Sequence, residues 1–267
     1  MSFTAFSPFP GVWHIADAMG VHMTLLEDED SALLYDCGYG LEDVRAFVST
    51  LTHKPLTVIL SHMHHDHALG AMWFERVYLH ESDIPFTDTY TGEYQRTRVL
   101  AQAETRGISG IAQDYSSRPM ASILPLSEIP DLPSAFQLIH LPGHTPGTVC
   151  LLDTRHRLLL TSDNWNPTTW VFFPEAMGLE TYMNSFQSLL KLPFDHVLAP
   201  HSGRVHTRDE LERFHAGITR EKVLSSERTS LGDPYHVDTR HLVPYDGTEL
   251  CFDFEKARSF LSGDDLT

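Results

Sequence analysis

The sequence predicts an α/β fold in which β-sheets carry helices on their outer faces. Short apolar runs bounded by turn residues alternate with segments of helical periodicity, in two successive passes along the 267-residue chain. Hydrophobic residues make up 42% of the chain and charged residues 21%, which is the composition of a globular protein with a sizeable core. We therefore expect one domain over residues 1–267, with an insertion at 81–133 and a C-terminal extension at 225–267.

The first pass begins with three apolar runs separated by short turn-like segments, which predicts a meander of strands. A segment with helical spacing of apolar residues follows, and then a continuous apolar run that predicts a buried strand. The elements predicted in this pass are strands at 11–16, 23–27, 31–35, 56–60 and 76–80 and helices at 41–51 and 68–74.

The insertion at 81–133 is irregular and polar, and only its segment around 95–104 predicts a helix. Two interpretations of the insertion stay open. It forms either a lid over a site or a contact between copies of the chain.

The second pass repeats the alternation of strands and helices. Its last helix is predicted to begin after Thr207, because Glu210 stands three residues further on, as in a capping box. The C-terminal extension is expected to be strand-rich or irregular. The elements predicted in this pass are strands at 137–141, 148–153, 157–161 and 196–199 and helices at 179–192 and 207–224.

Charge and composition limit the partners of the chain. There are 19 Lys and Arg against 36 Asp and Glu, and this net charge of −17 argues against nucleic-acid binding and for a small-molecule partner. No apolar run approaches the roughly 20 residues that span a membrane. The first ten residues lack the pattern of a signal peptide, and the three widely spaced cysteines make no disulfide framework. We therefore expect a cytoplasmic protein, and a homo-oligomer stays open.

The densest chemical feature is the stretch 61–67, which follows the predicted strand at 56–60. His62, His64, Asp66 and His67 stand there in an H-x-H-x-D-H pattern. Imidazole and carboxylate groups are the ligands that zinc and neighbouring metals prefer. This stretch therefore predicts a metal site at the end of a strand.

Three later strand ends carry further candidate ligands. His144 lies in a Pro-Gly-His-Thr-Pro-Gly segment, Asp163 follows the strand at 157–161, and His201 follows the strand at 196–199. Ligands of layered α/β proteins gather at the carboxyl ends of strands, so these residues are expected to complete one shared site.

Taken in order, these motifs resemble those of the metallo-β-lactamase-fold hydrolases over about residues 10–205. The resemblance implies an αββα sandwich of two mixed β-sheets covered by helices, with a dinuclear zinc site. It implies a first metal held by His62, His64 and His144, a second held by Asp66, His67 and His201, and Asp163 as the bridging ligand. Asp36 resembles the first motif of the family and is expected to orient the metal loop.

The resemblance also implies the chemistry. A metal-bound hydroxide would attack the carbonyl of a small thioester, lactone or ester, and Asp66 would also carry a proton to the leaving group. Aspartate at position 163 resembles the glyoxalase II and lactonase branches, and His64 stands where the flavodiiron branch has glutamate. The same ligands accept manganese, iron or cobalt. The alternatives are a β-lactam or phosphodiester hydrolase and, from another class, a non-catalytic or diiron redox protein.

Some residues near these motifs have a second interpretation. The aromatic segment 165–174 forms either a substrate wall, with Trp165, Trp170 and Phe172, or a core or dimer contact. His65 lies inside the cluster but outside the family pattern, and we expect it to pack locally or face solvent. His22 and Met23 fall in a loop and strand start that could overhang the site, and core or surface packing is their favoured interpretation.

Overall fold

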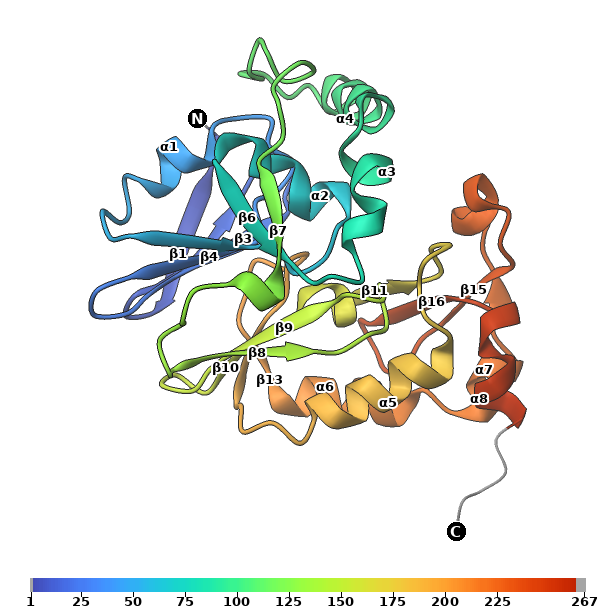
Figure 1. Ribbon diagram of the computed structural model, residues 1–267. Helices are drawn as coiled ribbons and strands as arrows, with labels where there is room; N and C mark the ends of the chain where they lie inside the picture. The colour runs from blue at the N-terminus through green and yellow to red at the C-terminus, as the bar shows by residue number, and fades with distance from the viewer. Residues whose placement is uncertain (1, 263–267) are drawn as a thin grey trace. The chain divides into compact units, whose positions relative to one another are not determined.

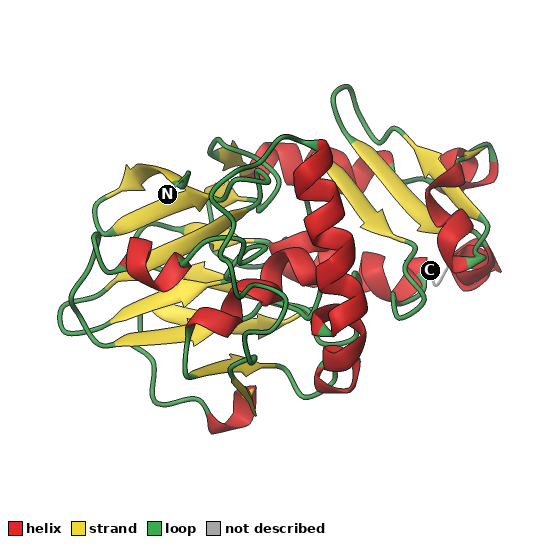
Figure 2. Cartoon of the chain, turned by 90° about the horizontal axis from the view of Figure 1, so that it is seen from above, coloured by secondary structure: helices red, strands yellow, loops and turns green. Residues whose placement is uncertain are grey.

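The computed structural model describes residues 2–262, whose strands and helices are coloured in Figure 2. This part of the chain divides into two compact units. Unit 1 contains the chain up to Ser134 together with Pro200–Gly203, and unit 2 contains Ala135–Ala199 and the chain from Arg204 onward. The single-domain organisation stays a prediction. Among the described residues, every helix is too short or too polar to cross a membrane.

Unit 1 is built on one seven-stranded sheet (Figure 1). The strands follow one another in chain order across the sheet, antiparallel from the first to the fourth and parallel from the fourth onward. The predicted meander is confirmed, and the sheet gains an edge strand at each side that the sequence analysis missed, β1 and β7. The strands are β1 (Thr4–Phe9), β2 (Val12–Ala16), β3 (His22–Glu27), β4 (Ala32–Tyr35), β5 (Leu56–Ile59), β6 (Arg76–Leu79) and β7 (Ser122–Pro125).

The first helix of unit 1 is shorter than its periodicity suggests, whereas the insertion contains a longer helix than expected. The helix predicted at 41–51 covers Val44–Val48 (α1), because the Asp43 side chain accepts a hydrogen bond from the Ala46 N–H and starts the helix there. The insertion is more regular than expected, since it contributes β7 to the sheet and a helix of 13 residues, α4. The other helical elements are α2 (His65–Ala68), η1 (Leu69–Trp73), η2 (Ile84–Phe86), α3 (Thr87–Thr91), α4 (Glu93–Thr105) and η3 (Leu126–Glu128).

The core of unit 1 lies between the sheet and these helices. All four residues of β4 are buried, as expected for a strand in the middle of a covered sheet. Val44 and Val48 of α1 and Ala68 of α2 pack into the same apolar cluster as Leu34 and Val58. Burying a side chain such as Leu or Val stabilises a fold by roughly 1.5–3 kcal/mol. This packing fixes the end of β5, where the loop with the predicted metal ligands begins.

Unit 2 contains two sheets. The first is five-stranded, in the order β13-β12-β10-β9-β8, and the second is four-stranded, in the order β11-β16-β15-β14. The second sheet pairs a strand that follows Asp163 with three strands of the C-terminal extension, so the extension is strand-rich, as expected. The strands are β8 (Phe136–His140), β9 (Val149–Asp153), β10 (Leu158–Leu160), β11 (Thr168–Val171), β12 (His196–Leu198), β13 (His206–Thr207), β14 (Glu227–Arg228), β15 (Thr239–Leu242) and β16 (Glu249–Asp253).

The single helix predicted at 207–224 is wrong, because the segment forms two helices. The first begins with the predicted capping box between Thr207 and Glu210 and ends at Gly217, where an added Cβ would lie 2.2 Å from a backbone oxygen. Thr219 then caps a new helix. The helical elements of unit 2 are η4 (Ser162–Asn164), α5 (Leu179–Leu189), α6 (Arg208–Gly217), α7 (Arg220–Leu224), η5 (Ser230–Tyr235), η6 (Glu255–Ala257) and α8 (Arg258–Ser262).

Glu210 also stabilises the start of α6 electrostatically. Burial acts to raise the pKa of Glu210, but the Arg204 guanidinium, the Thr207 N–H and the His206 ring outweigh burial and lower the pKa to about 2. The carboxylate is therefore ionised at neutral pH and paired with a cation.

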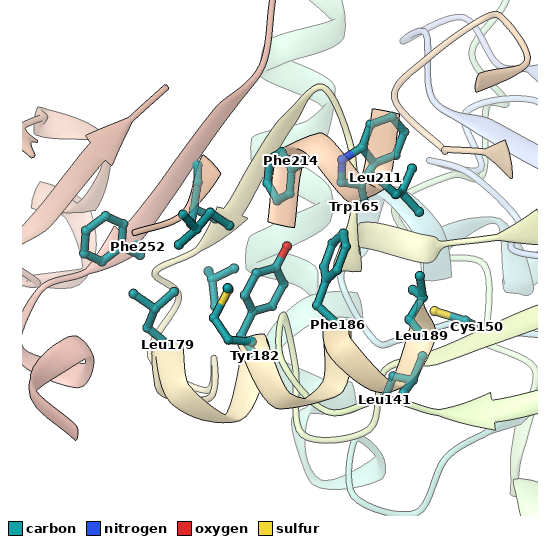
Figure 3. Packing of buried hydrophobic residues seen from close by; sticks show 14 of the residues in the cluster. Leu141, Cys150, Trp165, Leu179, Tyr182, Phe186, Leu189, Leu211, Phe214 and Phe252 are labelled. Carbon is teal, nitrogen blue, oxygen red and sulfur yellow. The ribbon is translucent and has the colours of Figure 1, made fainter. Parts of the chain in front are cut away.

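The core of unit 2 contains a group of aromatic side chains among its aliphatic ones. Tyr182 and Phe186 project from α5 toward Phe214 and Trp165 (Figure 3). The rings of Phe186 and Phe214 are stacked with centroids 5.6 Å apart, and the indole of Trp165 is fully buried. This packing anchors the segment that carries Asp163, because Trp165 is only two residues further along the chain.

Candidate metal centre

The predicted metal-binding loop follows β5 directly and leads into α2. β5 ends at Ile59, and His64 has an extended backbone and stands as the N-cap of α2. His62 and His64 therefore precede the helix, whereas Asp66 and His67 lie in its single turn. A strand, a sharp turn and a helix start within six residues bring four ligand-type side chains to one end of β5.

Unit 1 gathers five of the seven predicted ligands, and we call them the N-terminal ligand set. The set consists of His62, His64, Asp66, His67 and His201. The Nε2 atoms of His67 and His201 lie 3.4 and 3.5 Å from Oδ2 of Asp66, and one ligand atom from each of these three residues lies within 4.8 Å of the others. The ring centroid of His62 lies 4.2 Å from that of His67 and 4.7 Å from that of His64.

Solvent reaches this set unevenly. His62, His64 and His67 are buried, whereas the side chain of His201 is 35% exposed. The set is therefore anchored in the core through β5 and α2 and is accessible from the side of His201.

Asp66 is held as a carboxylate. Burial acts to raise its pKa, but the neighbouring imidazoles of His67, His65 and His201 outweigh burial and hold the pKa of Asp66 well below its usual range. An ionised carboxylate suits a metal ligand and a proton acceptor, because both roles need a lone pair on oxygen.

Asp36 lies beneath the loop and fixes it. Its carboxylate accepts hydrogen bonds from the backbone N–H of Ser61 at 2.7 Å and from the Ser61 hydroxyl at 2.8 Å. Its Oδ2 atom also lies 2.9 Å from Nδ1 of His67. Because the carboxylate only accepts, it selects the tautomer of His67 with the proton on Nδ1, and Nε2 is left as the ligand atom. These are the contacts that an orienting residue needs.

The backbone of Asp36 has a positive φ of 68°. Few residues other than glycine adopt this left-handed region, and aspartate and asparagine are among those that do. The conformation turns the chain at the end of β4 and points the carboxylate toward the metal loop.

Unit 2 carries the other two predicted ligands, His144 and Asp163, which we call the second ligand set. Nε2 of His144 lies 3.4 Å from Oδ2 of Asp163. Nδ1 of His144 donates to the backbone carbonyl of Trp170 at 2.5 Å, which leaves Nε2 on the side of Asp163. Both residues are buried, so their separation is set by packing.

Two asparagines position the second ligand set, and the sequence analysis missed both. The Asn164 amide oxygen accepts from the backbone N–H of His144 at 3.2 Å, and the Asn166 amide donates to Oδ1 of Asp163 at 3.0 Å. No local pattern identified these contacts, because Asn164 meets His144 across 20 positions of the chain and the contact of Asn166 with Asp163 depends on how the intervening loop folds.

His65 packs beside the ligands. Its ring lies 5.5 Å from that of Tyr39 and parallel to that of Tyr90. Burial lowers the pKa of His65 to about 4, so the ring is neutral at pH 7. Its surroundings fit the local packing expected from the sequence.

The donors of both sets fit a metal. They are five imidazoles and two carboxylates, which is a ligand type that binds zinc, iron, manganese or cobalt. The three cysteines are buried. Burial raises the pKa of the Cys150 and Cys251 thiols to about 12, and it also raises the pKa of the Cys37 thiol well above its usual range. The thiols stay protonated and are poor ligands.

The three aromatic residues predicted to line a substrate pocket have different surroundings. Trp165 is 0% exposed and belongs to the apolar core of unit 2, which indicates a packing role. Phe172 is 1% exposed, and its ring lies against those of Trp170 and Phe173, with centroids 5.5 and 4.7 Å away. Trp170 is 39% exposed and lies beside Phe173, whose ring contacts His144 edge-on with centroids 5.6 Å apart. Only Trp170 of the three presents an accessible surface.

The family model of the metallo-beta-lactamase superfamily matches residues 16–201 of the chain. The chain belongs to the metallo-beta-lactamase superfamily. The mixed sheets with helices are those of its α/β sandwich fold, so the predicted fold class is confirmed.

A distant relative is the acyl-coenzyme A thioesterase MBLAC2 of Gallus gallus. It is 22% identical over an alignment of 184 positions, and the match covers 63% of this chain and 66% of that protein. The chain therefore matches slightly less than two thirds of the length of that relative.

Solved structures agree on the fold. TTHA1623, crystallised in a di-iron-bound form, is 25% identical with a TM-score of 0.54, covering 78% of this chain and 96% of that one. The sec-alkylsulfatase Pisa1 from Pseudomonas sp. is 15% identical with a TM-score of 0.57, covering 83% and 42% of the two chains. The family protein TTHA1429 from Thermus thermophilus is 18% identical with a TM-score of 0.55, covering 82% of each chain.

Proposed function

We propose that this protein is a metal-dependent hydrolase in which water attacks the carbonyl carbon of a small thioester, lactone or ester and the acyl C–S or C–O bond breaks. The observation that carries the proposal is the donor set. Imidazoles and carboxylates converge at strand ends, and His67 and His144 are each fixed through Nδ1 so that Nε2 serves as the ligand atom.

The two ligand sets are proposed to act together on two ions. His62, His64 and His144 would hold one ion, Asp66, His67 and His201 would hold the other, and Asp163 would serve both. Bound metal ions supply Lewis acidity, which lowers the pKa of water and polarises a carbonyl oxygen.

The side chains themselves orient the site and move a proton. Asp36 holds the Nδ1 proton of His67, and the carbonyl of Trp170 holds the Nδ1 proton of His144. Asp66 is ionised at neutral pH, so its Oδ1 or Oδ2 atom can accept a proton from the attacking water and return it to the leaving group.

The substrate class rests on two supports. The distant relative MBLAC2 is named an acyl-coenzyme A thioesterase. In addition, Trp170, Phe173 and Tyr235 form an aromatic cluster next to His144, and the Phe173 and Tyr235 ring centroids lie 5.5 Å apart. An apolar surface beside a ligand suits an acyl chain, because pockets bind ligands mainly through apolar contact.

A panel of substrates tests the proposal. Protein loaded with zinc, manganese or iron is assayed on acyl-CoA thioesters, lactones, aryl esters, a β-lactam and a phosphodiester. Turnover of a thioester, lactone or ester that is lost in His64→Ala and after chelation is the expected result. Turnover that survives in His64→Ala, or the lack of turnover on every substrate with fully loaded protein, would contradict it.

Iron is the second candidate metal, favoured by the solved structure of TTHA1623, which is a di-iron-bound form. An oxygen-dependent redox role would need iron in place of zinc. Elemental analysis of protein purified without added metal distinguishes the two, since zinc supports hydrolysis and two irons per chain would favour the redox alternative.

A further inference from the structure

Two histidines outside the ligand sets hold the segment that carries His201. His14 on β2 places Nε2 3.1 Å from the carbonyl oxygen of Ser202. His22 on β3 places Nδ1 3.1 Å from the carbonyl oxygen of Pro200, and the backbone N–H of His22 donates to the same oxygen at 2.8 Å. The residues on either side of His201 are therefore both hydrogen-bonded to the N-terminal meander.

The segment that carries His201 belongs to unit 1. Pro200–Gly203 follows β12, a strand of unit 2, yet it is part of unit 1. His14 and His22 make three hydrogen bonds to this short segment. A loop attached in this way cannot shift without breaking them, so the position of His201 depends on both histidines.

The two imidazoles form one rigid unit. Their rings are stacked, with centroids 4.5 Å apart and an angle of 12° between planes. His14 is 2% exposed, and its Nδ1 atom lies 2.9 Å from the Thr24 hydroxyl on the neighbouring strand. Each ring is thus fixed by a stacking partner as well as by hydrogen bonds.

The acceptors determine which nitrogen carries the proton. A backbone carbonyl only accepts, so His14 must donate through Nε2 and His22 must donate through Nδ1. In neutral His14 the Nδ1 atom then accepts from the Thr24 hydroxyl. The two histidines therefore use opposite ring nitrogens to hold the same segment.

We infer that His14 and His22 are positioning residues that set the metal ligand His201 by clamping the backbone on both sides of it. This inference rests on the proposed function for the role of His201 as a ligand. It adds that the affinity of one metal depends on two side chains that do not contact the metal. Hydrogen bonds that orient a metal ligand commonly affect metal affinity in this way.

The opposite use of the ring nitrogens gives a discriminating test. The amide nitrogen of glutamine replaces the donor at Nε2, and that of asparagine replaces the donor at Nδ1. We expect His14→Gln and His22→Asn to keep wild-type metal affinity. We expect His14→Asn and His22→Gln to weaken the binding of one zinc ion by about tenfold or more.

Zinc affinity is measured by competition with a chromophoric chelator, and His201→Ala identifies the ion concerned. In cobalt-substituted protein, the weakened variants should change the visible absorption of the same ion. Denaturation of the metal-free proteins shows whether each variant folds. If a variant of the buried His14 does not fold, the comparison of His22→Asn with His22→Gln alone tests the inference.

A packing role predicts a different pattern. Equal losses or no losses in all four variants, while the wild type binds two ions, would overturn this inference and leave the proposed function standing. Failure of the wild type to bind any metal would overturn both.

Discussion

Asp36→Asn separates the orientation of a ligand from the stability of the fold. Asparagine accepts the left-handed backbone of Asp36, whose φ is 68°, so the substitution changes hydrogen bonding and charge without backbone strain. The carboxylate serves two N–H groups, the backbone of Ser61 and Nδ1 of His67, at 2.7 and 2.9 Å. Either orientation of an amide turns its NH₂ group toward one of these donors.

The loss of metal affinity in Asp36→Asn can be estimated from the hydrogen bond that the amide fails to make. A hydrogen bond to a charged group contributes about 1.5–3 kcal/mol, and losing the one to His67 frees the ring from its required orientation. Since about 1.4 kcal/mol corresponds to a tenfold change, the ion held by His67 should bind roughly tenfold to a hundredfold more weakly.

The assay is zinc competition against a chromophoric chelator, with the bound metal counted by elemental analysis. Asp153→Asn is the matched control, because Asp153 is also fully buried and accepts from Arg155 and His156 at the end of β9 away from His144. That control should lower thermal stability and leave metal affinity unchanged. Wild-type affinity for both ions in Asp36→Asn would refute the reasoning.

Three further predictions concern stability and the aromatic surface. Gly70→Ala should lower the free energy of unfolding by about 3 kcal/mol or more, because its Cβ would lie 1.9 Å from a backbone oxygen. Gly107→Ala is the control, since its Cβ would have no atom within 4 Å, and it should cost only the ~1–2 kcal/mol of a left-handed backbone. Denaturant titrations measure both. The pKa of Glu210 is about 2 against a usual 4.5, so ionised Glu210 stabilises the fold by at most about 3 kcal/mol. This stabilisation is complete above pH 4.5 and is lost as the pH falls toward 2. The difference in unfolding free energy between wild type and Glu210→Gln should therefore shrink over that range, and a difference that grows would contradict the prediction. Trp165→Ala should destabilise the core by about 3–5 kcal/mol, as measured by thermal melting. Trp170→Ala should change stability little and raise KM for acyl substrates in kinetic assays. The reverse pattern would reject these assignments.

The predictable elements are those whose signal is local. The meander and the strand β5 follow from alternation and apolar runs, and the start of α6 follows from the Thr207 and Glu210 capping box. Misjudged elements depend on remote contacts. β7 is a strand because it pairs with β6, and the break after Gly217 reflects a close approach to the backbone of Pro244.

The same division holds for the candidate site. By itself, the sequence determined which ligand-type side chains are available, because the type and order of the seven candidate ligands and the spacing of the His62–His67 stretch are properties of the chain. Tertiary structure decided what surrounds them. It set Asn164 and Asn166 against the second ligand set, buried Trp165 in the core and brought His14 and His22 onto the segment of His201. Such contacts join residues up to 188 positions apart, and no local pattern encodes which distant carbonyl a histidine will meet.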